Sequence, residues 1–234
     1  MAYLEGKNLV ASYGVVPILH ECSVEVEKGE LAVIVGPNGA GKSTVMRVLL
    51  GMLEATSGSV KFDGKDISML STQERINHGL AFVPQSKNVF PSMTVEENLQ
   101  MGGFIRKDDI SKTIDEVYEL FPILHEKRKQ LAEQLSGGQR QQVAFGRAMM
   151  TRPSVMLLDE PTAGVSPIVM DEIFSNILDV RNAGMAVLMV EQNAQQALNI
   201  ADKGYVLVSG RNEHTGTGKE LINNPEVRKK FLGG

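Results

Sequence analysis

A glycine-rich segment that ends in a lysine and two hydroxyl residues carries the most distinctive chemistry in this sequence. Its spacing is G-x-x-x-x-G-K-[ST], and it reads Gly36-Pro37-Asn38-Gly39-Ala40-Gly41-Lys42-Ser43-Thr44. Glycines let successive backbone N–H groups point into one anion-sized concavity. A helix that begins near the lysine adds its free first-turn N–H groups and the positive end of its dipole. We therefore predict that this segment, the phosphate loop, binds a nucleoside triphosphate.

Two side chains of the phosphate loop are expected to contact the bound nucleotide and its metal ion directly. Lys42 would reach the β- and γ-phosphates, and the Ser43 hydroxyl would ligate Mg²⁺. The apolar run Leu31–Val35 precedes the loop and Val45–Leu50 follows it, which predicts a strand before the loop and a helix after it. An ordinary glycine turn between strand and helix is the alternative, and the complete spacing makes it the weaker one.

Two adjacent carboxylates follow a second apolar run. Asp159 and Glu160 come directly after Val155–Leu158, so they emerge at the carboxyl end of a predicted buried strand, where ligands of open α/β sheets bind. Asp159 would hold Mg²⁺, directly or through water, and Glu160 would orient and polarise the water that attacks the γ-phosphorus. The alternative is an acid pair at a helix N-terminus, which the presence of the phosphate loop disfavours.

A serine and two glycines open another predicted helix, which runs from about Arg140 to Met150. Because one chain needs only one set of donors on its γ-phosphate, this second anion-binding terminus is explained most simply if it serves a nucleotide on another molecule. A capped helix with a glycine entry turn is the alternative. The segment reads Leu135-Ser136-Gly137-Gly138-Gln139.

Composition narrows the class of protein. A length of 234 residues with 42% hydrophobic residues can bury the core of one large α/β domain. The net charge of -4 gives no bulk attraction to nucleic acid, so we expect no nucleic-acid partner. Cys22 shares one face of a predicted strand with Val24 and Val26, which favours a buried position over a reactive thiol. No stretch approaches the ~20 apolar residues of a membrane span, so we expect membrane contact only through another protein.

The periodicity along the chain predicts how these segments are arranged. Alternating patterns over 4–26 and 58–64 indicate antiparallel strands, whereas the apolar runs 155–158 and 186–190 are typical of a parallel sheet. Two capping boxes, at Ser71 and at Thr94, predict helix starts. We expect one domain over 1–234, in which 1–89 and 152–234 form a nucleotide-binding α/β core with an antiparallel lobe and 90–151 form an inserted helical lobe.

The order of these segments resembles the ATP-binding-cassette (ABC) ATPases over nearly the whole chain. The resemblance implies a P-loop NTPase fold, α/β with a mostly parallel sheet, an antiparallel β subdomain and an inserted helical subdomain. It also implies ATP and Mg²⁺ as cofactors. By resemblance, 36–44 is the Walker A segment, 155–160 is Walker B, and 135–139 is the signature segment that completes a partner's ATP site in a head-to-tail dimer.

Four further positions take their roles from this resemblance. Gln85 matches the glutamine that contacts Mg²⁺, the attacking water and the transport subunit, and a solvated loop glutamine is the alternative. Tyr13 matches the aromatic residue that stacks on adenine, and a half-buried edge tyrosine is the alternative. Two positions depart from the family pattern, since Ser166 stands in place of an aspartate and Gln192 in place of the switch histidine.

The segments 188–194 and 201–207 look like those of the branched-chain amino-acid importer ATPases. This implies a subunit on the cytoplasmic side of the membrane, bound to permease subunits and to a second cassette subunit. Gln192 can donate a hydrogen bond but cannot carry a charge. Because the similar importers pair two different cassettes, the resemblance implies a heterodimer whose partner has its own histidine, and a homodimer is the alternative. Alternatives are an ATPase of a urea or amide importer, a non-transport ABC ATPase such as a ribosome or DNA-repair factor, and an ATP-gated scaffold.

Overall fold

A six-stranded β-sheet forms the centre of the computed structural model, which describes residues 2–231. Its strand order is β10-β9-β3-β8-β7-β6, and β9, β3, β8, β7 and β6 run parallel while β10 is antiparallel to β9. The two apolar runs predicted for a parallel sheet are its strands β7 and β8, and the strand predicted before the phosphate loop is β3. The strands are β3 (Leu31–Val35), β6 (Leu80–Val83), β7 (Val155–Asp159), β8 (Ala186–Val190), β9 (Lys203–Val208) and β10 (Arg211–Gly216).

The register of the three central strands brings their carboxyl ends level. Ile34 of β3 pairs with Val190 of β8, which pairs in turn with Asp159 of β7. Segments that follow these strands therefore leave the sheet side by side at one edge. This edge is where ligands of open parallel sheets bind.

A second, antiparallel sheet has the order β2-β1-β4-β5. Its strands are β1 (Leu4–Tyr13), β2 (Val16–Val26), β4 (Ser57–Phe62) and β5 (Lys65–Asp66). The predicted antiparallel lobe is thus confirmed. Cys22 is fully buried in β2 as predicted, and burial raises the pKa of its thiol to about 12.

Helix α1 (Lys42–Leu49) lies between the two sheets. Its apolar residues share one buried cluster with Ala32 and Ile34 of β3 and with Leu9 and Val24 of the antiparallel sheet. Residues Val33 and Val35 point to the other face of the central sheet, where α7 (Pro167–Asn182) and α8 (Ala194–Ile200) cover it. The molecule is therefore layered, and both faces of the central strands are buried, which explains their continuous apolar sequences.

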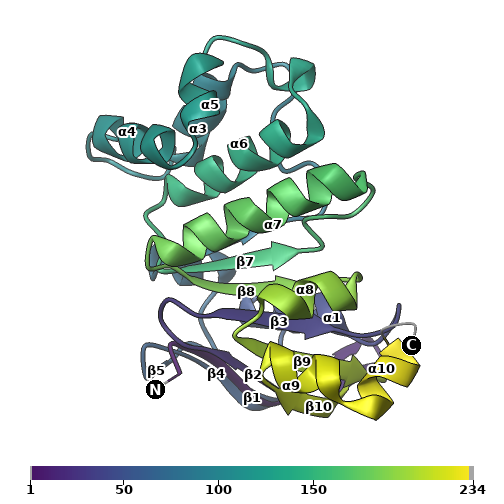
Figure 1. Cartoon of the computed structure of the whole chain (residues 1–234). Coiled ribbons are helices and arrows are strands. Elements are labelled where there is room, and N and C mark those ends of the chain that lie inside the picture. Colours follow the sequence, from purple (N-terminus) through teal and green to yellow (C-terminus); the bar gives the residue numbers. More distant parts are fainter. Residues whose placement is uncertain (1, 232–234) are drawn as a thin grey trace.

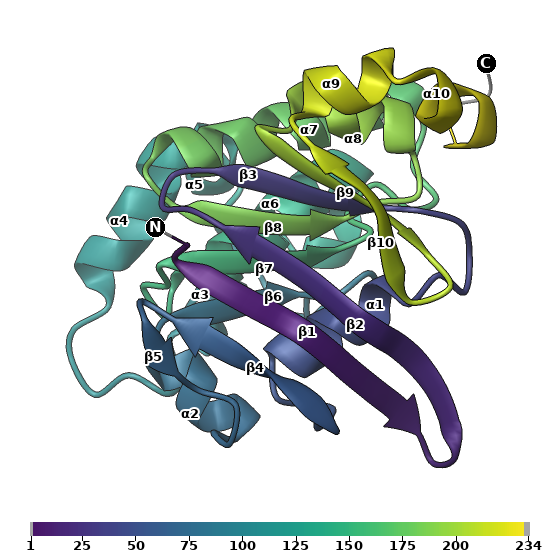
Figure 2. The ribbon, with the colours of Figure 1, turned by 90° about the horizontal axis from the view of Figure 1, so that it is seen from below.

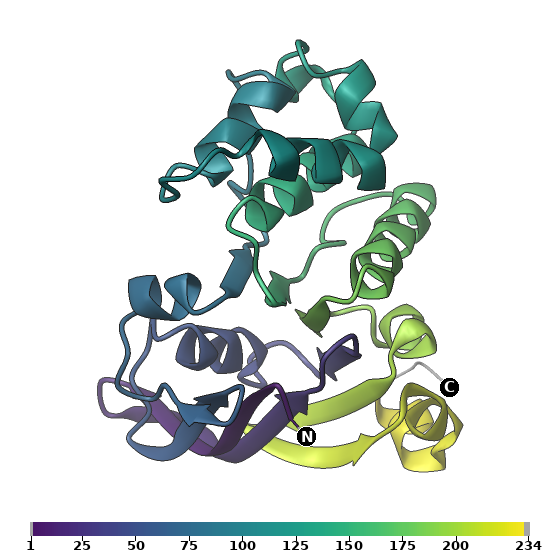
Figure 3. The same ribbon diagram turned by 90° about the vertical axis from the view of Figure 1, so that its left-hand side faces the viewer.

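The helices that join β6 to β7 lie at one end of the molecule, beyond α7 (Figures 1 and 3). They are α3 (Val95–Gly102), α4 (Ser111–Leu120), α5 (Pro122–Glu126), the short 3₁₀ helix η1 (Ala132–Gln134) and α6 (Gly137–Met149). Their position agrees with the helical lobe expected for 90–151, although the domain limits themselves stay a prediction. Residue 1 and residues 232–234 of the expected domain lie outside the described residues.

Helix starts follow the capping patterns, with one correction. Ser71 and Thr94 cap α2 (Thr72–Asn77) and α3 through capping boxes, as predicted. The predicted start of α6 near Arg140 is wrong, because the helix already begins at Gly137. Its N-cap is Ser136, whose hydroxyl accepts a hydrogen bond from the backbone N–H of Gln139. Both glycines therefore lie in the first turn. No helix within residues 2–231 combines the length and apolar character needed to cross a membrane.

The carboxyl-terminal helices α9 (Gly218–Asn223) and α10 (Pro225–Phe231) pack beside β9 and β10 (Figure 2). Lys230 of α10 donates to Glu213 of β10 at 2.7 Å. Val227 is fully buried in the cluster that contains the apolar residues of α7 and α8. Helix α10 is thus fixed to the central sheet by an ion pair and by apolar packing.

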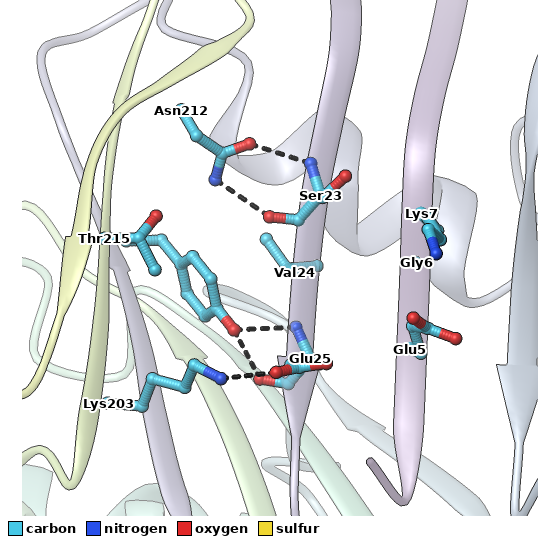
Figure 4. Close-up of a pocket in the computed structure, with 10 residues that line it drawn as sticks. Glu5, Gly6, Lys7, Ser23, Val24, Glu25, Lys203, Asn212 and Thr215 are labelled. Atoms are coloured by element: carbon cyan, nitrogen blue, oxygen red, sulfur yellow. Dashed lines mark hydrogen bonds and ion pairs between the residues drawn. The ribbon is translucent and has the colours of Figure 1, made fainter. Parts of the chain in front are cut away.

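Side chains of β9 and β10 join the two sheets along the outer edge of β2 (Figure 4). The Asn212 side chain accepts from the backbone N–H of Ser23 at 2.7 Å and donates to its carbonyl at 2.8 Å. The Tyr205 hydroxyl makes the same two contacts with Glu25, both at 2.9 Å. These side chains replace the neighbouring strand that β2 lacks on this edge. The hollow beside them, about 440 Å³, shares no lining residue with the phosphate loop.

We call the side-chain hydrogen bonds from β9 and β10 to β2 the seam. They predict that Asn212→Ala lowers the stability of the protein. The substitution leaves the N–H and carbonyl of Ser23 without their side-chain partner, so we expect the free energy of unfolding to fall by about 1–3 kcal/mol in urea titrations. The control is Asn223→Ala on the exposed surface of α9, where the loss should stay below about 0.5 kcal/mol. Equal losses in the two variants would contradict the role of the seam.

Candidate functional site

The phosphate loop leaves β3 at the level edge of the sheet and runs into α1. Its backbone takes positive φ at Gly36 (152°), Gly39 (79°) and Gly41 (98°), and Gly41 is the N-cap of α1. A Cβ atom on Gly36 would lie 2.1 Å from the carbonyl oxygen of Leu207, so no larger residue fits there. The glycines predicted from phosphate chemistry are therefore also required by the fold.

Lys42 lies inside the curve of the loop. Its side chain donates to the carbonyls of Gly36 (3.0 Å) and Pro37 (3.2 Å), and only 5% of the residue is exposed. The amide of Ala40 donates to the Pro37 carbonyl at 3.1 Å, which tightens the same turn. Lys42 is also the first residue of α1, so its ammonium lies over the loop that leads into the helix N-terminus, an arrangement typical of an anion site.

Ser43 and Asp159 meet across the edge of the sheet. The Ser43 hydroxyl donates to the Asp159 carboxylate at 3.1 Å, although 116 positions separate the two residues. Burial raises the pKa of Asp159, and the Ser43 hydrogen bond and the charges of Arg47 and Lys42 oppose that rise. The structure thus brings together two of the three residues predicted to contact Mg²⁺, whereas Gln85, the third, is hydrogen-bonded to Glu160.

Oxygen ligands of this kind suit Mg²⁺, which usually binds one or two carboxylates together with phosphate oxygens and water. No group of three or more His, Cys, Asp or Glu side chains within residues 2–231 forms a protein-only metal cluster. The Ser43–Asp159 pair therefore fits an ion that arrives with a nucleotide. Ser43 and Asp159 would hold Mg²⁺, which would neutralise charge on the phosphates.

Glu160 and Gln85 form the second pair at this edge. The Gln85 side-chain amide donates to the Glu160 carboxylate at 3.0 Å. Glu160 takes a left-handed backbone conformation (φ 45°), and its amide donates to the Val190 carbonyl at 2.9 Å. A residue held in this conformation costs free energy, and such residues cluster at functional sites. The contact places the predicted base beside the predicted water-orienting glutamine.

Glu191 belongs to the same edge, and the sequence interpretation missed it. It is 1% exposed, and its carboxylate accepts from the Thr162 hydroxyl (2.8 Å), the Thr162 amide (3.1 Å) and the Gln192 amide (3.0 Å). Burial raises its pKa, and these hydrogen bonds act against the rise. Glu191 therefore ties the turn after Glu160 to the residue at 192. The sequence feature that could have identified it is an acidic residue directly after an apolar run.

Gln192 faces the phosphate loop from the end of β8. It is exposed and borders a hollow of about 240 Å³ that the start of the loop, 36–38, and the end of α10 also line. The structure thus brings Gln192 and the phosphate loop together, as the predicted switch position requires.

Tyr13 ends β1 and is 43% exposed. Arg47 of α1 donates to its hydroxyl at 3.1 Å, and the guanidinium carbon lies 6.0 Å from the ring centroid. The tyrosine is therefore linked to the helix that follows the phosphate loop. Its predicted stacking on adenine remains a prediction.

The signature segment lies apart from this group. Ser136 and Gln139 form the capping box of α6, and the Arg140 side chain donates to the Leu135 carbonyl at 2.7 Å. No hydrogen bond or ion pair among the described residues joins 135–139 to 36–44. Ser166, the other family departure, is the N-cap of α7. One chain thus brings together the phosphate loop, Asp159, Glu160 and Gln85 and keeps the signature segment separate from them.

Comparisons with known proteins cover almost the full chain. A family model described as ABC transporter matches residues 19–163. The chain is 47% identical to "High-affinity branched-chain amino acid transport ATP-binding protein BraG" of Pseudomonas aeruginosa, over 95% of this chain and 96% of that protein. It is 39% identical to "Probable branched-chain amino acid transport ATP-binding protein LivF" of Archaeoglobus fulgidus, over 97% of each chain.

The chain is also similar to an ATP-binding protein of an export system and to a solved structure of an ATP-binding cassette. "Lipopolysaccharide export system ATP-binding protein LptB" of Haemophilus influenzae is 36% identical over 100% of this chain and 98% of that protein. Among solved structures, the ADP conformation of an ATP-binding cassette of an ABC transporter superposes with a TM-score of 0.90 at 31% identity and covers 100% of both chains. The P-loop NTPase fold expected from the sequence is therefore confirmed.

The arrangement predicts that Glu160→Gln slows ATP hydrolysis while ATP affinity is kept. Glutamine retains the shape of the side chain but cannot accept the proton of the attacking water, so turnover should fall roughly 100-fold or more. Phosphate release and ATP titration measure the two quantities. Glu119→Gln, on the exposed surface of α4, serves as the control and should leave both unchanged. Wild-type turnover in Glu160→Gln would rule out Glu160 as the base.

Proposed function

Because the chain belongs to the ABC transporter family and is an ATP-hydrolysing subunit of that kind, we propose that it powers solute import through separate transmembrane permease subunits. The proposed solutes are branched-chain amino acids. The proposed location is the cytoplasmic face of the membrane, where the permease subunits would hold the chain. The 47% identity to BraG supports this substrate class.

The observation that carries the proposal is the meeting of two residue pairs at one edge of the central sheet. Ser43 contacts Asp159, and Gln85 contacts Glu160. We assign the first pair to Mg²⁺ and the second to the attacking water, because carboxylate and amide groups at these places can ligate a cation and orient a nucleophile. Lys42 would hold the β- and γ-phosphates.

We further propose that two cassettes complete each other's sites. The signature segment caps α6 with Ser136 and makes no hydrogen bond to the phosphate loop of its own chain. A capped helix terminus that stays exposed can donate to the γ-phosphate of a partner's nucleotide. ATP would then act as the contact that joins the two chains, and its hydrolysis would release them.

The partner is proposed to be a different cassette subunit. Glutamine at 192 can donate a hydrogen bond to a phosphate but never a charge, and a charged donor is worth roughly 1.5–3 kcal/mol against about 1 for a neutral one. An ATP site that uses Gln192 should therefore hydrolyse ATP about tenfold more slowly than one that uses a histidine, but it should stay active. A partner with a histidine would give two unequal sites, whereas a homodimer would have two modestly slow ones.

The permease is proposed to dock on the surface that follows Gln85, residues 85–93. Phe90 in this surface is 38% exposed, and the Arg147 guanidinium carbon lies 4.7 Å from its ring centroid. The exposed ring supports docking over the alternative, burial in the core of the helical lobe. Because Gln85 also contacts Glu160, movement at this surface would reach the proposed attacking water.

Export is the second candidate function, favoured by the 36% identity to LptB over the full chain. Co-purification from membranes separates the candidates. Tagged full-length chain should retain permease subunits and a second cassette, and the reconstituted complex should move branched-chain amino acids inward with ATP. A complex that instead extracts lipopolysaccharide, or one that lacks membrane subunits, would contradict the import proposal. Transport of urea or short amides alone would correct only the substrate.

The trans arrangement predicts that Ser136→Arg leaves ATP binding by the monomer intact but abolishes the ATP-dependent dimer. Arginine removes the cap and puts bulk and charge where the partner's phosphates would lie. Ser71→Arg is a matched control, because Ser71 is also an exposed N-cap in a capping box, on α2. Size-exclusion chromatography with ATP, in the Glu160→Gln background, reads the dimer. If Ser136→Arg dimerises as well as Ser71→Arg does, the signature segment is only structural.

A further inference from the structure

The turn between β9 and β10 touches the phosphate loop. It consists of Ser209 (φ 46°) and Gly210 (φ 76°), and two positive φ angles are typical of a two-residue hairpin turn. The amide of Gly210 donates to the Ala40 carbonyl at 2.9 Å, and its carbonyl accepts from the His20 amide at 2.9 Å. One glycine thus links the phosphate loop to β2 of the antiparallel sheet.

The same hairpin also contacts the beginning of the loop. Gly36 packs so closely on Leu207, near the end of β9, that its Cβ position would lie 2.1 Å from the Leu207 carbonyl oxygen. Gly36 and Ala40 stand at opposite ends of the turn that encloses the Lys42 ammonium. The hairpin therefore contacts both ends of this turn, Gly36 through Leu207 and Ala40 through Gly210.

We propose that Gly210 is a positioning residue for nucleotide binding, acting through the peptide between Ala40 and Gly41. In a planar trans peptide the C=O and N–H groups point in opposite directions, and no peptide bond among the described residues is cis. A hydrogen bond that fixes the Ala40 carbonyl toward Gly210 therefore aims the Gly41 N–H away from it. This inference rests on the proposed role of residues 36–44 as the phosphate site.

The position tolerates only glycine. A Cβ atom on Gly210 would lie 1.8 Å from the carbonyl oxygen of Ile18 in β2. Backbone atoms cannot yield as a flexible side chain can, so any side chain pushes the turn away from β2. The turn would then draw its amide away from Ala40, and the 40–41 peptide would lose its fixed orientation.

The chain contains a matched turn in which an added side chain would collide with nothing. Asp63 (φ 48°) and Gly64 (φ 74°), between β4 and β5, have almost the same φ angles as Ser209 and Gly210. A Cβ atom on Gly64 would have no neighbour within 4 Å. Alanine at Gly64 therefore introduces the same backbone strain as alanine at Gly210, without the collision.

The test compares Gly210→Ala with Gly64→Ala in the full chain. Isothermal titration with Mg²⁺ and ATP is run at a temperature where circular dichroism shows both variants folded. The loss of one neutral hydrogen bond that orients a phosphate donor should weaken ATP binding in Gly210→Ala roughly fivefold to tenfold. Gly64→Ala should bind as wild type does. Equal dissociation constants in the two variants would overturn the proposal and leave Gly210 a folding residue only.

A second pair of variants adds no side chain. One glycine inserted after Ser209 lengthens the turn and shifts its amide, and one glycine inserted after Asp63 does the same in the matched turn. The first insertion should weaken ATP binding and the second should not, and equal binding again overturns the proposal. Lys42→Ala, titrated in parallel, tests the phosphate site itself. If Lys42→Ala keeps wild-type affinity the site is misassigned, whereas lost binding there with no effect at Gly210 rejects only the positioning role.

Discussion

The level register of β3, β8 and β7 is the constraint on which the rest of the site depends. Ile34, Val190 and Asp159 lie side by side across three parallel strands, so the segments that follow them begin at one edge. This brings the Ser43 hydroxyl within hydrogen-bond distance of a carboxylate from a distant part of the chain. A shift of one residue in either strand pair would turn the side chains to the other face and separate these groups.

The position of α1 between two sheets gives the site its rigidity. Apolar side chains of this short helix, such as Val45 and Met46, are fully buried against both sheets. An isolated helix of eight residues would be marginal in water, so its stability comes from this packing. The phosphate loop is consequently held at one end by the sheet and at the other by a buried helix. Such preorganised amides stabilise phosphate charge without reorganisation at the moment of reaction.

Local sequence predicted the parts of the site whose chemistry lies within a few neighbouring residues. The spacing of the phosphate loop predicts its glycines and lysine, and the acids at the end of β7 follow from their place after an apolar run. Alternation against continuous apolar runs predicts the α/β class, and the family resemblance implies the P-loop NTPase fold. Glu191 and Gly210 were missed because their roles depend on partners brought near by strand register, Thr162 for the first and Ala40 for the second. The start of α6 was misplaced because the strength of the Ser136 cap outweighed the low helix propensity of the glycines.

The central claim is that one edge of the parallel sheet binds Mg²⁺ and ATP for hydrolysis. A crystal structure of the Glu160→Gln chain grown with both tests it most directly. We predict the β- and γ-phosphates on the loop amides and Lys42, with Mg²⁺ bound to Ser43 and held by Asp159 directly or through water. Nucleotide bound at another surface, or phosphates that contact neither Lys42 nor the loop amides, would contradict the account.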